Sequence, residues 1–496
     1  MIRFWEIMPG ALAWLTLFGL AFLSWRAPVA VVVFILLYDL YWFLKLIYLF
    51  FHLRSSFTKM NANLKMDWLA KLKKDNPENW EKIRHLVILP VYRESYGIIK
   101  QAFSNLIEAN YPKEKFFVVL ATEERGGETD RETALKIEEE FGAAFKGFLI
   151  TRHPADLPGE LAGKGSNQAW AAKEALSKLI NPLSISYDDV LVSVFDIDTR
   201  TDQDYFGILA YKFLNSSHPY RSSFQPIPLF INNVHEAPFF ARLVGFSGSF
   251  WQLMQESRPE QLVSFSSHSM PLKALVEVGF WETDIVSEDS RIFFQCLAHY
   301  KGDWRAEPLL YPVYMDAVAG ETFFAALKNL YKQQRRWAWG AENLARAAND
   351  FSKDKSFPAK VGRFWKWTLF DGVYSWSTSS FIIFLFGWFP NLLGDEAFRT
   401  SVISYNLPRL TGWILNLSSI GIITSAFLSI IILYPRLKGF KRWYLIWYFL
   451  EWLLTPLVFI VFSAFPALDA QTRLMLGGRF RLGYWRTPKD NLPASR

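Results

Sequence analysis

Long apolar runs stand near both ends of the chain. Each is uncharged or nearly so and long enough to cross a bilayer core of about 30 Å. The sequence therefore predicts two transmembrane helices near the start and three near the end, at residues 7–25, 28–51, 372–394, 410–435 and 443–466. Asp39 and Glu451 interrupt two of these runs, and such residues either line a polar path or pair with neighbouring helices.

Between residues 54 and 362 the apolar runs are short and alternate with charged helical segments, as in a soluble α/β domain. Three runs are typical of buried parallel strands, at residues 85–90, 116–120 and 190–195. Helices are predicted at residues 129–141 and 169–180, the second capped by Ser166. Ligands of such sheets bind beyond the carboxyl ends of the strands.

Composition agrees with a chain divided between lipid and water. Apolar residues make up 51% and charged residues 20% of 496 positions, and the single cysteine, Cys296, excludes an intrachain disulfide. The net charge of +7 comes largely from basic residues at the ends of the apolar runs, which argues against nucleic acid as a partner. The positive-inside tendency places the middle domain in the cytoplasm.

The basic residues after residue 467 conflict with the number of spans. Two spans before the domain and three after it would leave this tail outside, although it contains Arg473, Arg479, Arg481 and Arg486. Three explanations are open: residues 364–376 lie along the interface and hide a re-entrant piece, Pro456 breaks the last helix, or the tail is outside. Basic residues at 436–442 mark the link between the final two spans as cytoplasmic.

Polar side chains follow each predicted strand. Tyr92 and Glu94 come after the first, Glu123 and Glu124 after the second, and Asp196 and Asp198 after the third. Two carboxylates two residues apart on an extended segment point to one side and suit Mg²⁺ or Mn²⁺ shared with phosphate. Acidic turn residues after a strand are the alternative.

Three further stretches carry candidate chemistry. Lys164, between two glycines before a helix, is either an anion ligand or a solvated loop lysine. Ser287-Glu288-Asp289 opens a predicted helix, where acids complement the dipole or Asp289 acts as a general base. Gln333-Gln-Arg-Arg336-Trp337 combines phosphate donors, Arg335 included, with a stacking ring, although an interfacial basic helix uses the same residue types.

Taken in order, Pro90-Val-Tyr92-Arg-Glu94, Gly163-Lys164-Gly165-Ser-Asn167, Asp196-Ile-Asp198, Ser287-Glu288-Asp289 and Gln333-Gln-Arg-Arg336-Trp337 resemble the membrane-bound family 2 glycosyltransferases. Cellulose, chitin and hyaluronan synthases belong to that group. The resemblance covers about residues 86–337. It implies an α/β fold, a GT-A-like (Rossmann-like) cytoplasmic domain inserted between transmembrane helices, in a multi-pass protein of the cell membrane.

The resemblance also implies roles. Tyr92 and Glu94, with Glu123 or Glu124, would hold the nucleoside of a nucleoside-diphosphate sugar, usually a UDP-sugar. Asp198, helped by Asp196, would bind Mg²⁺ or Mn²⁺, and Lys164 and Arg336 would neutralise the leaving group. Trp337 would stack on the acceptor, and Asp289, beside Glu288, would take the acceptor proton and give inversion. The implied donor-binding set is Pro90, Tyr92, Glu94, Glu123, Glu124, Lys164, Asp196, Gln333, Arg336 and Trp337.

The chain departs from the family pattern in two places. Ala121-Thr-Glu-Glu-Arg125 stands where the family has Asp-Asp-x-Ser, so either glutamate can meet the base. Phe265-Ser-Ser-His-Ser269 stands where polymer synthases often have a Gly-Ser-Gly-like stretch, which leaves processivity open. The tail from Tyr484 to Lys489 resembles the terminal segment of some bacterial members and favours a cytoplasmic tail.

The expected organisation has six parts: two transmembrane helices in residues 1–53, a cytoplasmic linker at 54–84, the glycosyltransferase domain at 85–345, an interfacial segment at 346–371, three transmembrane helices in 372–466 and a basic tail at 467–496. The leading function is extension of a polysaccharide, processively or not. The alternatives are transfer of one sugar to a lipid or polyprenyl phosphate, and a non-catalytic membrane subunit that binds sugar nucleotide.

Overall fold

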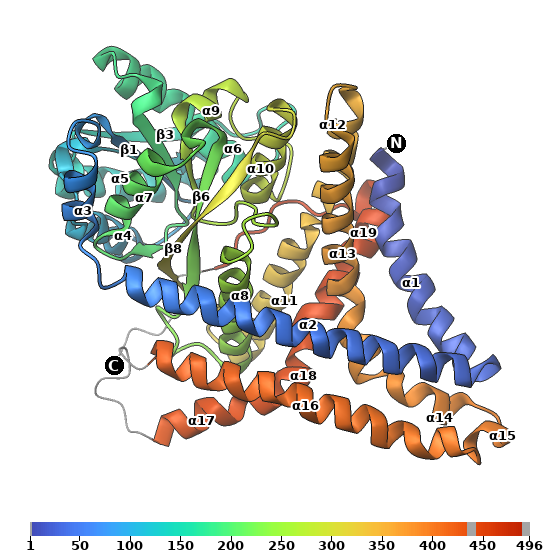
Figure 1. Cartoon of the computed structure of the whole chain (residues 1–496). Coiled ribbons are helices and arrows are strands. Elements are labelled where there is room, and N and C mark those ends of the chain that lie inside the picture. The colour runs from blue at the N-terminus through green and yellow to red at the C-terminus, as the bar shows by residue number, and fades with distance from the viewer. Residues whose placement is uncertain (1, 434–442, 489–496) are drawn as a thin grey trace.

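An eight-stranded mixed sheet forms the centre of the domain. The computed structural model describes residues 2–433 and 443–488. The strand order is β3-β2-β1-β4-β7-β6-β8-β5, with helices on both faces (Figure 1). The strands are β1 Arg84–Pro90, β2 Phe116–Glu123, β3 Gly147–His153, β4 Val190–Val194, β5 Arg200–Thr201, β6 Ser222–Phe230, β7 Ser269–Pro271 and β8 Arg305–Met315.

The three predicted strands are β1, β2 and β4, and they are parallel neighbours as expected. Val87 in β1 lies opposite Val118 in β2 and Ser193 in β4. The strands β3, β6 and β8 were not predicted from the sequence. Their apolar positions are interrupted by polar residues or prolines, which weakens the pattern typical of a buried strand.

Successive side chains of the central strands enter two different cores. Val87 and Leu89 of β1 pack on one face, while Leu86 and Ile88 pack on the other, as the alternation of strand side chains requires. The first core is closed by α3 Trp68–Asp75, α4 Tyr96–Glu108, α5 Gly127–Phe141 and α7 Tyr205–Asn215. The second is closed by α6 Lys164–Ala175, α9 Leu272–Glu277, α10 Glu288–His299 and α12 Glu342–Lys353.

The prediction that Ser166 caps a helix was wrong. The helix α6 begins at Lys164, two residues earlier, so Ser166 lies inside its first turn. The Ser166 hydroxyl donates to the carbonyl oxygens of Leu161 (2.8 Å) and Gly163 (3.0 Å). A capping side chain would accept from a backbone N–H instead. The earlier start places Lys164 on the helix and not in a loop.

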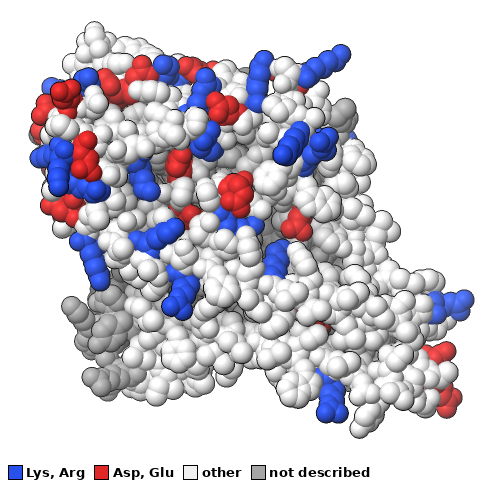
Figure 2. Space-filling model, viewed as in Figure 1, with Lys and Arg blue, Asp and Glu red and all other residues white. Residues whose placement is uncertain are grey.

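Within the described residues, four helical runs are long and apolar enough to cross a membrane: α1 Ile2–Arg26, α2 Pro28–Asn63, α16 with its first 31 residues from Val402, and Trp443–Leu476. A fifth candidate is bent by 43° between α13 Ala359–Phe384 and the segment Phe386–Leu393. Residues 364–376 form the middle of the continuous helix α13. Charged residues gather over the domain, while the face over α2 and α16 is largely uncharged (Figure 2).

The last apolar run is broken, and it contacts both the domain and the apolar helices α1, α2 and α13. It consists of α17 Trp443–Glu451, α18 Thr455–Phe459 and α19 Phe465–Leu476, with a 3-10 turn directly before Pro456. In α17, Glu451 pairs with Arg242 (Nε to Oε2, 3.0 Å) of α8 Phe239–Glu256. In α19, Asp469 accepts from Arg335 (2.9 Å) of α11 Phe323–Ala338.

Glu451 and Asp469 of this run therefore lie beside the domain. Of the two acidic residues that interrupt the apolar runs, Glu451 pairs with an arginine of the domain. The other, Asp39 of α2, is buried at 3% exposure. Beyond α19, Arg486 reaches Glu94 (Nε to Oε1, 3.0 Å) at the end of β1. The basic tail therefore contacts the domain. The basic residues expected at 436–442 and Lys489 lie outside the described residues.

Glu256, at the end of α8, stabilises a bulge in β8. Its carboxyl Oε2 accepts from the N–H of Leu310 (3.0 Å), where the pairing of β8 with β6 shifts register. Leu310 has a φ of +50°, in the left-handed region that costs energy for a leucine. The side chain of Glu256 is 1% exposed, and burial raises the pKa of this carboxyl to about 8.

Glu256→Gln is expected to stabilise the protein in a pH-dependent way. Between pH 4.5, the ordinary pKa, and about 8, the unfolded state loses a proton that the folded state keeps, so rising pH favours unfolding of the native chain. Glutamine still accepts the Leu310 N–H but has no such proton. The difference in thermal stability should widen from about pH 4.5 to 8 and stay constant above. Parallel pH profiles for the two proteins would contradict this expectation.

Candidate active site

A buried lysine stands at the centre of the candidate site. The ammonium of Lys164, 8% exposed, contacts Asp196 Oδ1 (2.9 Å) and Asp289 Oδ1 (2.9 Å). Glu288 Oε1 lies 3.7 Å away. Lys164 comes from α6, Asp196 from the end of β4 and the acidic pair from the first turn of α10. The structure therefore brings together three of the sequence motifs at the carboxyl edge of the sheet, where the sheet topology predicts a site.

The buried charges of the cluster shift the pKa values of Lys164 and Glu288. Burial alone would lower the pKa of Lys164, but attraction to Asp196, Asp289 and Glu288 outweighs it and holds this pKa well above its ordinary value. Burial, together with repulsion from Asp289, raises the pKa of Glu288 to about 8. Glu288 therefore stays protonated at neutral pH. Within the described residues Glu288 Oε1 has no hydrogen-bond partner, in agreement with that assignment.

The close approach of Glu288 to Lys164 depends on Gly165. A Cβ at Gly165 would lie 3.1 Å from the Cβ of Glu288, closer than side chains normally pack. On the other side of the lysine, a Cβ at Gly163 would lie 2.5 Å from the ring of Tyr484. The two glycines that flank Lys164 therefore let α10 and the tail pack directly against it.

Asp196 and Asp198 offer carboxylate oxygens at the end of β4. Asp196 Oδ2 accepts from the Ser266 hydroxyl (2.6 Å), and Asp198 Oδ2 accepts from the N–H of Asp316 (3.2 Å). Across residues 2–433 and 443–488 no group of three or more His, Cys, Asp or Glu side chains is arranged to hold a metal ion. Mg²⁺ commonly takes only one or two carboxylates and completes its shell with phosphate and water. The two carboxylates are donors of that type, and Asp196 Oδ1 is also paired with Lys164.

Polar residues beyond β1 and β2 form a second cluster. The guanidinium groups of Arg93 and Arg125 lie 5.1 Å and 4.8 Å from the centroid of the Tyr92 ring. Glu94 Oε2 accepts from the Tyr92 N–H, and Glu123 pairs with Arg125. Pro90 ends β1 opposite Ala121 of β2. The arrangement offers a ring face and carboxylates to a planar heterocycle.

The two adjacent glutamates of this cluster are used differently. Glu123 is 4% exposed and accepts from Arg125 Nε (2.9 Å). Glu124 Oε2 accepts from the N–H of Ala155 (2.9 Å), in the loop after β3. Asn167 of α6 donates to the carbonyl oxygen of Ala121 (2.7 Å) and so ties the lysine helix to the end of β2.

The two arginines of the Gln333 to Trp337 motif point in different directions. Gln333, Arg336 and Trp337 share one face of α11, as their spacing requires. The Arg336 guanidinium lies 5.4 Å from the ring centroid of Tyr484, and the Trp337 ring packs against Phe230 and Phe265. Arg335 instead donates to Asp469 of α19. Its predicted place beside a diphosphate was wrong, because adjacent helical positions lie about 100° apart.

The tail after α19 contacts both clusters. Tyr484 lies against Gly163 and under Arg336, and Lys332 of α11 lies 5.0 Å from the Trp485 ring centroid. Arg486 then pairs with Glu94 and donates to the carbonyl oxygen of Arg93 (3.0 Å). The tail thus connects the lysine cluster to the cluster around Tyr92.

Sequence reasoning missed the contacts of Ser266, Tyr484 and Arg486. The stretch that contains Ser266 departs from the family pattern, and the tail that contains Tyr484 and Arg486 is similar to the terminal segment of some members. No periodicity within either segment indicates its partner, because each contact joins residues far apart in the chain. Knowledge of the sheet order would have been needed to place them.

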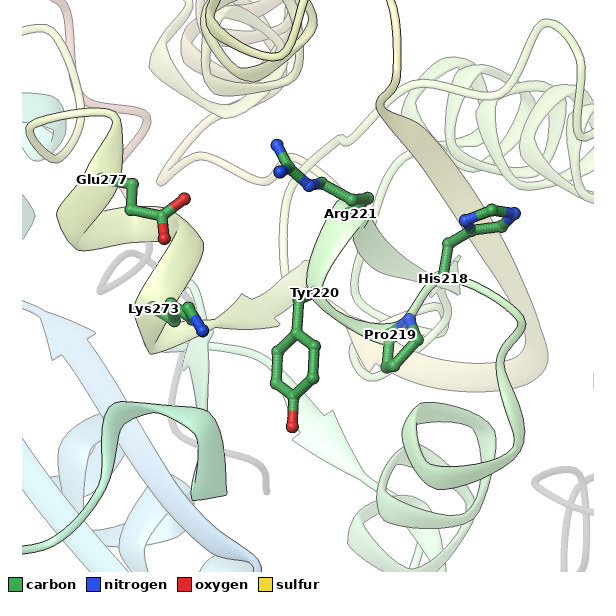
Figure 3. Close-up of a pocket in the computed structure, with 6 residues that line it drawn as sticks. All are labelled: His218, Pro219, Tyr220, Arg221, Lys273 and Glu277. Atoms are coloured by element: carbon green, nitrogen blue, oxygen red, sulfur yellow. The ribbon is translucent and has the colours of Figure 1, made fainter.

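A separate cavity of about 290 Å³ lies at the opposite edge of the sheet (Figure 3). Its lining comes from the segment directly before β6 and from α9: His218, Pro219, Tyr220, Arg221, Lys273 and Glu277. β6 runs in the same direction as β4, since each is antiparallel to β7. The cavity is therefore at the amino ends of the strands and does not belong to the candidate site.

No family model and no curated protein sequence matches the chain. Among solved structures, a mannosyltransferase from Pyrobaculum calidifontis in complex with GDP-Man and Mn²⁺ is similar over 82% of this chain and 99% of its own, with TM-score 0.37 and 13% identity. S. aureus TarS 1–349 is similar over 72% and 93%, with TM-score 0.38 and 13% identity. Its complex with UDP-GlcNAc gives TM-score 0.33 and 15% identity. These are loose superpositions, so any functional assignment depends on the site itself.

Proposed function

We propose that this chain is an inverting membrane glycosyltransferase of the family 2 synthase type. It would transfer a sugar from a nucleoside-diphosphate sugar, a UDP-sugar by resemblance, to a growing polysaccharide. The observation that carries the proposal is the contact of Lys164 with both Asp196 and Asp289. Three motifs with the residue types of donor binding and proton transfer meet at one ammonium group.

The proposed roles follow from the geometry and from the chemistry of each group. Tyr92, Glu94 and one of the two glutamates after β2 would hold the nucleoside. Asp198 and Asp196 would hold Mg²⁺ or Mn²⁺ with the diphosphate, and the ion would stabilise the negative charge of the leaving group. Lys164 and Arg336 would neutralise the remaining charge. Gln333 and Pro90 would support the donor site, and Trp337 would stack on the acceptor.

In the reaction, an acceptor hydroxyl oxygen attacks the anomeric carbon from the face opposite the diphosphate. A new C–O bond forms as the C–O bond to the diphosphate breaks, and the nucleoside diphosphate leaves with the bonding electrons. Asp289 takes the hydroxyl proton, which requires that its ion pair with Lys164 be released. An incoming diphosphate attracts the ammonium and would free Asp289 for that purpose.

We further propose how the chain lies in the membrane. The helices α1, α2, α13 with the segment that follows it, and α16 would cross the bilayer. The run Trp443–Leu476 would begin and end on the cytoplasmic side, since Glu451 and Asp469 within it pair with arginines of the domain, while its middle packs on α1, α2 and α13. The site would then face sugar nucleotides made in the cytoplasm.

A panel of nucleotide sugars tests the function. We expect purified protein in lipid to release nucleoside diphosphate from one donor, and EDTA to abolish release until Mg²⁺ or Mn²⁺ is restored. Product mass distinguishes a polysaccharide from a lipid that carries one added sugar. Absence of release with every donor, in the presence of either metal and of glycan and lipid acceptors, would contradict the enzymatic proposal and leave the binding-subunit alternative.

A further inference from the structure

The segment that carries Glu288 and Asp289 is held from behind by α12. Glu342, the first residue of that helix, is 5% exposed, and its Oε1 accepts from the N–H of Val286 (3.2 Å) and from the hydroxyl of Ser287 (3.1 Å). A single buried carboxyl oxygen thus fixes the two residues that immediately precede the acidic pair. None of the sequence motifs of the site includes Glu342.

The neighbours of Glu342 extend this contact along the same segment. Asn343 donates to the Ser290 hydroxyl (2.8 Å), one residue beyond Asp289. Arg346 donates to Glu282 Oε2 (3.0 Å) and Asp284 Oδ1 (3.0 Å). The first turn of α12 therefore holds residues on both sides of the acidic pair.

The usual means of fixing the start of α10 is absent from this helix. Ser287 occupies the N-cap position, but its side chain accepts no hydrogen bond from the first turn. Its hydroxyl is directed to Glu342 instead. An uncapped helix start is free to fray, and Asp289 is the second residue of α10. Ser264 holds the carbonyl oxygen of Asp289 (2.7 Å), and Glu342 holds the two residues that lead into this turn.

We propose that Glu342 is a positioning residue for Asp289, an inference that rests on the proposed function of Asp289 as the base. Glu342 holds the backbone of Val286 and the hydroxyl of Ser287, and so sets where the first turn of α10 places the carboxylate. Displacement of a catalytic group by about 1 Å can lower the rate roughly 100-fold. Loss of Glu342 should affect the chemical step more than the binding of donor.

Three variants test the proposal. Glu342→Ala removes both hydrogen bonds and should lower kcat roughly 10- to 100-fold, with the KM for donor changed less than about twofold. Glu342→Gln keeps an acceptor oxygen and should stay within about threefold of the native kcat. Asp350→Asn is the matched control: Asp350 lies on the same helix and pairs with buried Arg291 (2.5 Å) at a different point of α10. Its kcat should stay within about threefold, whatever its thermal stability.

Hydrogen exchange provides a readout that does not depend on activity. Amides of residues 286–290 should exchange faster in Glu342→Ala than in the native chain, and should be unchanged in Asp350→Asn. Unchanged exchange there, or a kcat loss in Glu342→Gln equal to that of Glu342→Ala, would overturn the positioning role. If amides of residues 286–290 exchange faster in Glu342→Ala but the native chain turns over no donor, the contact of Glu342 is supported and the proposed function fails. Failure of the positioning role and failure of the proposed function are therefore distinguishable.

Discussion

Replacement of Asp289 by asparagine is expected to abolish sugar transfer while donor binding is kept. A positioned general base contributes roughly 10²- to 10⁴-fold to a rate, and asparagine cannot accept the acceptor proton. The variant keeps the shape of the side chain and its acceptor oxygen, so Lys164 retains a partner 2.9 Å away at that position. Release of nucleoside diphosphate measures turnover, and calorimetry with the donor measures binding.

Asp303→Asn is the control for that experiment. Asp303 is a carboxylate of the same domain, 57% exposed, in a surface pair with Arg305 (3.2 Å). Its replacement should change neither turnover nor donor binding. Turnover of Asp289→Asn equal to that of the native chain would remove Asp289 from the mechanism and leave the contact with Lys164 as a structural ion pair.

Replacement of Lys164 by methionine should cost both stability and activity. Removal of one partner from a buried ion pair typically costs roughly 3–5 kcal/mol, because the remaining charge stays buried without compensation. Here Asp196 and Asp289 would face each other near Glu288 with no cation between them. Denaturation in detergent should show the loss of stability, and donor affinity should fall because a diphosphate would meet uncompensated carboxylates.

Two comparisons separate this effect from general damage. Adding Asp289→Asn to Lys164→Met should recover part of the lost stability, since one of the two carboxylates that Lys164 contacts is removed and neighbouring sites couple. Lys178→Met, at an exposed pair with Glu174, should change the free energy of unfolding by less than about 0.5 kcal/mol. A Lys164→Met protein as stable as the native chain would show that the ion pairs of the cluster contribute nothing net.

The centre of the fold and the edge that holds the site were predictable from the sequence. Continuous apolar runs at β1, β2 and β4 have few other interpretations, and short loops after them must place Glu94 and Asp196 at one edge. The identity of the residues that meet there was not derivable in the same way. Arg335 and Arg336 are chemically equal neighbours, and only the packing of α19 decides which one faces the site.

The remaining failures have a shared physical origin in long-range contacts. Ser166 has the residue type of a helix cap, but α6 begins at Lys164, with Glu288 and Tyr484 packed against the flanking glycines. In the last apolar run, which has the length and composition of a span, Glu451 and Asp469 pair with arginines of the domain, contacts that the sequence pattern did not indicate. Contacts of this kind outweigh the local structural preference of a segment, and they produce no periodic pattern in the sequence.

The contacts of the tail join the two ends of the chain and bear on the order of assembly. Glu6 of α1 pairs with Arg481, and Arg3 donates to the carbonyl oxygen of Leu474 (2.9 Å). Arg486 then reaches Glu94. Contacts of such sequence separation form late, because the whole intervening chain must first be synthesised and folded. In a partly synthesised chain, the sheet would therefore fold before the tail contacts the site. The ion pair of Arg486 with Glu94 would form only after α19 is complete.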